Sequence, residues 1–190
     1  MIARAAAPRS LLSGLTYTRI LAVPAVMGLI LLGPNHDSAY PAAAIVFTVA
    51  ALTDFADGYL ARRWAVATKL GSFLDTTADK LLVAGALIAL VDVDRASPWL
   101  AAIIIGRELL ILGLRGVVAA EGIVFAPSIW GKLKTNVQFL AIFLAILRFG
   151  GPLGGLHVDE WVMVVAAGIT VMSAVEYLTR FSSALSGGAR

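Results

Sequence analysis

Long apolar stretches separated by short polar breaks run along the whole chain. Six can be marked, at about Ile20–Gly33, Tyr40–Tyr59, Phe73–Val91, Trp99–Ala119, Val137–Gly150 and Trp161–Phe181. They lack the strict alternation that is typical of a half-buried strand. A helix crosses a membrane with about 20 mostly apolar residues, whereas an open sheet cannot satisfy its backbone in lipid. The pattern predicts an all-α, polytopic integral membrane protein with six transmembrane helices.

Turn-forming residues mark the breaks between these stretches. Gly33-Pro34-Asn35 follows the first stretch, and Gly150-Gly151-Pro152 lies between the fifth and the sixth. We expect a single six-helix membrane domain over residues 1–181 and a flexible tail over 182–190. The first stretch is short for a span, so its helix is expected to begin near Leu15, with Arg19 at the level of the lipid headgroups.

Composition narrows the class of protein. The chain has 190 residues, of which 59% are hydrophobic and only 14% charged, and its mean hydropathy is +0.89. These values exclude a water-soluble globular domain and a disordered chain. Cysteine is absent, which excludes disulfides and thiol chemistry. Arginines interrupt the first segment, so we do not expect a secretory signal.

Basic residues fall mainly on one side of the predicted membrane topology. With six spans, eleven of them share the side of both termini: Arg4, Arg9, Arg19, Arg62, Arg63, Lys69, Arg115, Lys132, Lys134, Arg180 and Arg190. The opposite loops hold only Arg95 and Arg148. Because basic loops stay in the cytoplasm, we expect both termini and the 62–72 and 115–136 loops to face the cytoplasm.

Four carboxylates are concentrated at the ends of two successive spans. Asp54 and Asp57 are three residues apart at the end of the second span, and Asp75 and Asp79 are four apart at the start of the third. Each pair shares a helix face, and the two spans are expected to be antiparallel neighbours. Charges inside a span cost about 3 kcal/mol each, so they usually serve a site.

Four carboxylates brought together would require cations to balance them. Hard oxygen ligands favour Mg²⁺, Mn²⁺ or Ca²⁺, and two divalent ions would balance four negative charges. A two-ion site of this kind indicates phosphoryl transfer. The competing interpretation is that these aspartates cap helices or pair with arginines. That interpretation explains any one of them, but it explains the whole set poorly.

The segment that contains these four aspartates, residues 54–79, matches a known sequence signature. Asp-x2-Asp-Gly-x2-Ala-Arg-x8-Gly-x3-Asp-x3-Asp is met without a gap by Asp54, Asp57, Gly58, Ala61, Arg62, Gly71, Asp75 and Asp79. This pattern, over residues 54–79, resembles that of the CDP-alcohol phosphotransferases, a family of integral membrane enzymes. The resemblance implies six spans, usually in a homodimer, and an active site at the cytoplasmic face. It also implies cleavage of a CDP-linked donor at its pyrophosphate.

The resemblance assigns roles to the signature residues. Asp54, Asp57 and Asp75 would bind metal, with Asp79 as a further ligand or as the catalytic base. The pocket for the CDP group of CDP-diacylglycerol would be lined by Gly58, Ala61, Arg62, Gly71 and Ser72. The cofactor implied is Mg²⁺ or Mn²⁺, as two ions. Lys80, next to Asp79, is expected either to extend towards the interface or to pair with a carboxylate.

Segments outside the signature resemble the bacterial phosphatidylglycerophosphate synthases of that family. They are Ile105-Gly106-Arg107-Glu108 and Trp130-Gly131-Lys132-Leu133-Lys134-Thr135. The acceptor implied is glycerol 3-phosphate, and the products are phosphatidylglycerophosphate and CMP. Other acceptors in the family, inositol phosphate or phosphatidylglycerol, remain alternatives, as does a divalent-cation transporter outside it.

Basic residues away from the signature are candidates for binding the acceptor phosphate. Arg107 lies within a span and needs an anion, and Arg115 follows about two turns later. Lys132 and Lys134 open the fifth helix. Arginine forks match phosphate oxygens. The alternative is that Arg115 and the lysines contact anionic headgroups. Glu108 is adjacent to Arg107 and is not expected to share its face.

Overall fold

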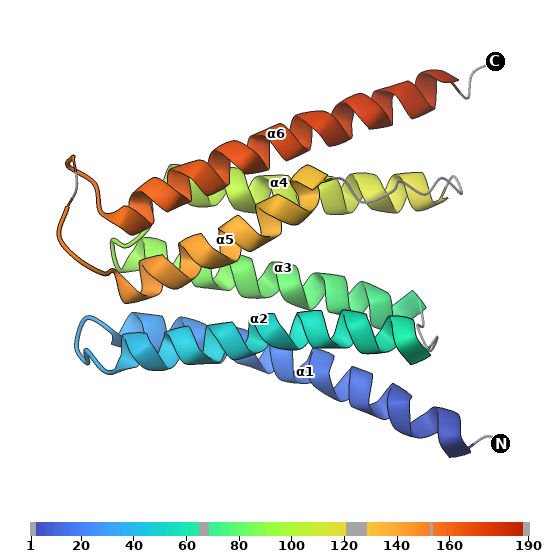
Figure 1. Ribbon diagram of the computed structural model, residues 1–190, viewed down its shortest axis with the longest axis horizontal. Helices are drawn as coiled ribbons and strands as arrows, with labels where there is room; N and C mark the ends of the chain where they lie inside the picture. Colours follow the sequence, from blue (N-terminus) through green and yellow to red (C-terminus); the bar gives the residue numbers. More distant parts are fainter. Residues whose placement is uncertain (1–2, 65–68, 121–128, 153, 188–190) are drawn as a thin grey trace. The chain divides into compact units, whose positions relative to one another are not determined.

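The computed structural model describes the backbone of residues 3–64, 69–120, 129–152 and 154–187. Side chains are described for residues 17–53, 74, 76–119, 129–131, 133–152 and 154–183. In these ranges the chain forms six helices and no strand (Figure 1). They are α1 (Ala3–Leu32), α2 (Ala39–Trp64), α3 (Lys69–Asp92), α4 (Pro98–Ala120), α5 (Ile129–Leu147) and α6 (Val158–Gly187). The all-helical class is confirmed.

The helices extend beyond the apolar stretches of the sequence. Helix α1 begins at Ala3, so the predicted start near Leu15 is wrong. Helix α6 continues to Gly187 and so includes much of the segment expected to be a tail. Apolar patterning marks where a helix can enter lipid, whereas backbone hydrogen bonding lets the helix continue through polar residues on either side.

Length and hydropathy single out one helix as a candidate span. In the described chain, Val158–Ser183 is long and apolar enough to cross a membrane, and Tyr17–Leu32 and Ala39–Thr53 are shorter apolar helices. Many large apolar side chains on the other helices are nonetheless exposed, among them Leu21, Ile45, Ile88 and Leu109. Extensive exposed apolar surface is typical of a protein that contacts lipid.

The chain divides into two compact units. Unit 1 is Met1–Arg95 with Ala145–Leu147, and unit 2 is Ala96–Leu144 with Arg148–Arg190. In unit 1, α1 packs against both α2 and α3. Small residues allow the close approach, since a Cβ on Gly85 of α3 would meet the side chains of Val23 and Met27 of α1. The largest apolar side chains of its core are Val26, Ile30, Phe47, Leu82, Leu87 and Leu90.

Two arginines tie the elements of unit 1 together. Arg19 of α1 is only 1% exposed, and its Nε donates a hydrogen bond to the carbonyl oxygen of Ala50 in α2, 3.3 Å away. Its side chain is thus buried between helices. Arg95 lies 3.4 Å from the centre of the Tyr40 ring and donates to the carbonyl oxygen of Ile146, at 2.6 Å. That bond satisfies a carbonyl near the end of α5.

In unit 2, α4 packs against α6, and α5 is joined to α6 by a buried polar pair. Gln138 Nε2 donates to Thr170 Oγ1 at 3.0 Å, and this hydroxyl in turn donates to the carbonyl oxygen of Ala166. The start of α6 is fixed by Glu160, whose carboxylate accepts from the backbone N–H of His157, a capping-box arrangement. These contacts set the register of the helices that carry the buried charges described below.

Candidate active site

The signature residues lie on the helices that the sequence predicts. Asp54, Asp57, Gly58, Ala61 and Arg62 are all in α2. Gly71, Ser72, Asp75 and Asp79 are all in α3. The helical backbone confirms that each aspartate pair is spaced to share one helix face, and α2 and α3 are in contact.

Only one of these residues has a described side chain. The side chains of Asp54, Asp57, Asp75 and the residues predicted to line the CDP pocket lie outside the described ones. Among the side chains that are described, no group of three metal-ligating residues occurs. The convergence of the four carboxylates therefore stays a prediction.

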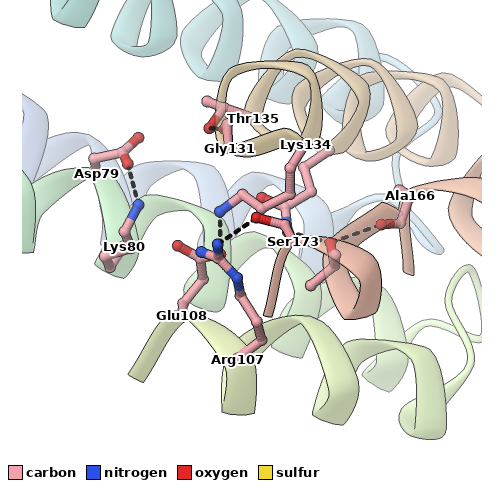
Figure 2. Close-up of polar contacts among 11 residues, drawn as sticks. Asp79, Lys80, Arg107, Glu108, Gly131, Lys134, Thr135, Ala166 and Ser173 are labelled. Carbon is pink, nitrogen blue, oxygen red and sulfur yellow. Dashed lines mark hydrogen bonds and ion pairs between the residues drawn. The ribbon is translucent and has the colours of Figure 1, made fainter. Parts of the chain in front are cut away.

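Asp79 is the signature carboxylate whose surroundings are described. Its side chain is 14% exposed, and its Oδ2 lies 2.8 Å from Nζ of Lys80 (Figure 2). Pairing with a carboxylate was one of the two roles expected of Lys80, and the structure bears it out. An ionised carboxylate with a cation beside it keeps oxygen lone pairs that can accept further bonds.

Buried charges from two helices of unit 2 meet at one carboxylate oxygen. Arg107 and Glu108 come from α4 and Lys134 from α5. Nη1 of Arg107 lies 3.3 Å from Glu108 Oε1, and Nζ of Lys134 donates to the same oxygen. Figure 2 shows both cations directed at this carboxylate. Glu108 and Lys134 are 4% and 2% exposed, so water hardly reaches the pair.

Helix α6 completes the cluster. Nη2 of Arg107 donates to Oγ of Ser173 at 2.7 Å, and Ser173 is 1% exposed. We call Arg107, Glu108, Lys134 and Ser173 the buried charge cluster. The hydrogen bond between Gln138 of α5 and Thr170 of α6 lies about one turn from Lys134 and Ser173. It links the two helices next to the cluster.

Among the described side chains, the buried charge cluster places two cations around one carboxylate in a poorly hydrated place. In addition, Nε of Arg107 is buried and has no hydrogen-bond partner among the described residues. Unsatisfied buried donors are costly. The cluster therefore has both the charge and a spare donor with which to bind an anion.

Arg115 lies on the same helix as Arg107, near enough for their like charges to repel. It is exposed, and its guanidinium lies 5.7 Å from the centre of the Tyr177 ring of α6, within cation–π range. Of the four predicted acceptor residues, the structure thus brings Arg107 and Lys134 together and places Arg115 nearby. The side chain of Lys132 lies outside the described ones.

Sequence reasoning missed two members of the buried charge cluster. Glu108 was not expected to share a face with its neighbour Arg107, and this prediction was wrong. Both side chains are long enough to turn towards α5 and meet there. For Ser173 the sequence offered only a weak indication of a role in the site, namely that it is a small polar residue in an apolar helix. A carboxylate in an otherwise apolar helix, such as Glu108, is itself a sign of a site.

Comparisons with known proteins identify the family to which the chain is similar. The family model described as CDP-alcohol phosphatidyltransferase matches residues 11–172. A CDP-diacylglycerol–glycerol-3-phosphate 3-phosphatidyltransferase of Bacillus subtilis is 38% identical, over 90% of this chain and 94% of that protein. A probable phosphatidylglycerophosphate synthase of Mycobacterium tuberculosis is 40% identical over 87% and 78%. A Pseudomonas fluorescens protein with the same name as the Bacillus relative is 37% identical over 86% of both chains.

The fold and these matches define the class as a helical, membrane-bound transferase. This chain belongs to the CDP-alcohol phosphatidyltransferase family.

Proposed function

We propose that this protein transfers the phosphatidyl group of CDP-diacylglycerol to glycerol 3-phosphate, which releases CMP and forms phosphatidylglycerophosphate. Relatives with this name match the chain over nearly their whole length. The observation that carries the choice of acceptor is the buried charge cluster, whose two cations and unpartnered Arg107 Nε suit an anionic acceptor.

The acceptor phosphate binds to Arg107, Arg115, Lys132 and Lys134 in this proposal. The unpartnered Nε of Arg107 supplies one donor, and Arg115 adds positive charge close by. A phosphomonoester carries a charge of about −1.5 to −2 at pH 7. Such a group is attracted to the four cations of this proposal. Binding of headgroup phosphates by Arg115 and the lysines is the competing interpretation.

The donor binds at the signature segment. Gly58, Ala61 and Gly71 leave space for the CDP group beside the helices, and Arg62 and Ser72 offer donors to its phosphate oxygens. CDP-diacylglycerol keeps its acyl chains in lipid, so its pyrophosphate lies near the interface.

The signature carboxylates supply an all-oxygen donor set on two helices in contact, which suits Mg²⁺ or Mn²⁺. Asp54, Asp57, Asp75 and Asp79 would hold two ions. When bound, such ions neutralise the pyrophosphate and the charge that develops on CMP. The fit rests on the oxygen chemistry of these residues and on their helical spacing.

The chemical step is an in-line displacement at phosphorus. A hydroxyl oxygen of glycerol 3-phosphate bonds to the phosphorus that carries diacylglycerol, and the bond from that phosphorus to the CMP oxygen breaks. Asp79 accepts the proton of the hydroxyl as general base; its alternative role is that of a ligand only. The chain's contribution is chiefly positioning and electrostatic stabilisation.

The protein works in the bacterial plasma membrane in this proposal, with six spans and with its termini and active site on the cytoplasmic side. The six helices have 19–30 residues. At 1.5 Å per residue five of them are longer than a hydrocarbon core of about 30 Å, and α5, at about 28 Å, is close to that thickness. A homodimer, implied by the family resemblance, stays a prediction.

A panel of acceptors tests the choice of substrate. Purified protein in detergent is incubated with CDP-diacylglycerol and Mg²⁺, together with glycerol 3-phosphate, inositol phosphate or phosphatidylglycerol, and the lipid product is identified by mass spectrometry. We expect phosphatidylglycerophosphate with the first acceptor and little product with the others. Turnover with inositol phosphate or phosphatidylglycerol alone would contradict the proposal.

A further inference from the structure

We propose that Glu108 is an internal anion that occupies the acceptor-binding cations until the acceptor phosphate replaces it. This inference rests on the proposed function, because it concerns the same acceptor site. Glu108 is thereby a positioning residue that sets how tightly the phosphate is held.

The geometry carries the inference. Two cations from different helices donate to one oxygen of Glu108, an arrangement in which a phosphate oxygen could equally be held. The carboxylate and a bound phosphate would therefore compete for the same N–H groups. Ser173 stays bonded to Arg107 through Nη2, so one side of the guanidinium remains anchored while Nη1 exchanges Glu108 for the phosphate and Nε gains a partner.

The energetics explain why an internal anion is needed. Arg107 and Lys134 are both largely buried, and two like charges in a poorly hydrated place repel each other strongly. Removing one partner of a buried charge pair is costly because it leaves the other uncompensated. Glu108 offsets part of this repulsion and keeps both cations directed inward while the acceptor is absent.

The same competition acts after the reaction. The hydroxyl of glycerol 3-phosphate is the reacting group, so its phosphate passes unchanged into phosphatidylglycerophosphate. The product therefore keeps the group that the cations bind. As Glu108 recovers its bonds to Arg107 and Lys134, it weakens the hold on that phosphate and favours product release.

The variant Glu108→Gln tests the inference, because glutamine keeps the shape and the carbonyl acceptor and removes only the charge. Inorganic phosphate is the probe, and its binding to purified protein in detergent is measured by calorimetry without turnover. We expect the Kd for phosphate to fall on the order of tenfold. The apparent KM for glycerol 3-phosphate should fall in parallel, with the KM for CDP-diacylglycerol unchanged. The control Glu108→Asp, which keeps the charge, should stay closer to the unaltered protein.

A second comparison, between a double variant and Lys134→Gln, tests the inference even if Glu108→Gln does not fold. The double variant Glu108→Gln/Lys134→Gln has the same net charge as the unaltered protein, and we expect it to bind phosphate more tightly than Lys134→Gln alone. Equal or weaker phosphate binding in both comparisons would overturn the inference. An unaltered protein that releases no CMP with glycerol 3-phosphate would instead overturn the proposed function, so the two failures are distinguishable.

Discussion

Arg107 is the residue in which burial, charge and hydrogen bonding point most directly to a ligand. Its Nη1 and Nη2 already have protein partners, while its Nε has none among the described residues. A guanidinium held in this way is oriented before a substrate arrives. Pre-orientation reduces the entropy that binding must overcome, which is consistent with a role in recognising the acceptor.

The variant Arg107→Lys keeps the positive charge and removes the planar fork. Charged hydrogen bonds contribute about 1.5–3 kcal/mol each, so the apparent KM for glycerol 3-phosphate should rise about 10- to 100-fold. The KM for CDP-diacylglycerol should change little. Steady-state kinetics with each substrate varied in turn measures both values.

A matched control for this variant is Arg180→Lys. Arg180 is exposed and pairs with Glu176 one turn away, so its replacement should leave both KM values unchanged. Equal increases of the two KM values in Arg107→Lys would contradict an acceptor role for Arg107, because they would indicate a general loss of structure.

At the scale of helices, neighbouring helices pack closely where one of them has a small residue. Gly33 at the end of α1 is an example, because a Cβ there would overlap the Tyr40 ring of α2. Tyr40 in turn stacks with Arg95, so it cannot move aside without losing that contact. The turn between α1 and α2 thus depends on the absence of a side chain at position 33.

Gly33→Ala should destabilise the protein by about 1–3 kcal/mol, the usual cost of overpacking. Thermal unfolding in detergent, followed by tryptophan fluorescence, measures the change. Gly28→Ala is the control in the same helix, because a Cβ there meets nothing within 4 Å, and alanine favours a helix over glycine. A melting temperature that falls as much in Gly28→Ala as in Gly33→Ala would contradict the steric explanation.

The sequence predicted the helical elements well and their ends poorly. Apolar stretches located all six helices, and the spacing of Asp54, Asp57, Asp75 and Asp79 placed them correctly on α2 and α3. It could not predict the extension of α1 to Ala3, because arginines interrupt the apolar signal of that segment while the helix continues through them. It also could not predict that Glu108 meets Lys134, since that contact depends on how α4 and α5 pack in space.

The whole molecule is expected to sit in the membrane with its basic side in the cytoplasm. The chain has no cysteine, so single cysteines can be introduced without removing any. A membrane-impermeant maleimide added to intact cells should label Asn35→Cys, in the turn between α1 and α2, but not Ser182→Cys in the last turns of α6. Both positions are exposed. The reverse labelling pattern would contradict the predicted orientation, and labelling of both would contradict an even number of spans.

The central claim is the transfer of a phosphatidyl group to glycerol 3-phosphate, and the stoichiometry of CMP release tests it most directly. Purified protein should release one CMP for each phosphatidylglycerophosphate formed, only when CDP-diacylglycerol, glycerol 3-phosphate and Mg²⁺ are all present. Asp57→Ala and Asp75→Ala should stay folded and release none. CMP released at the same rate without glycerol 3-phosphate, or undiminished release by both aspartate variants, would contradict the account.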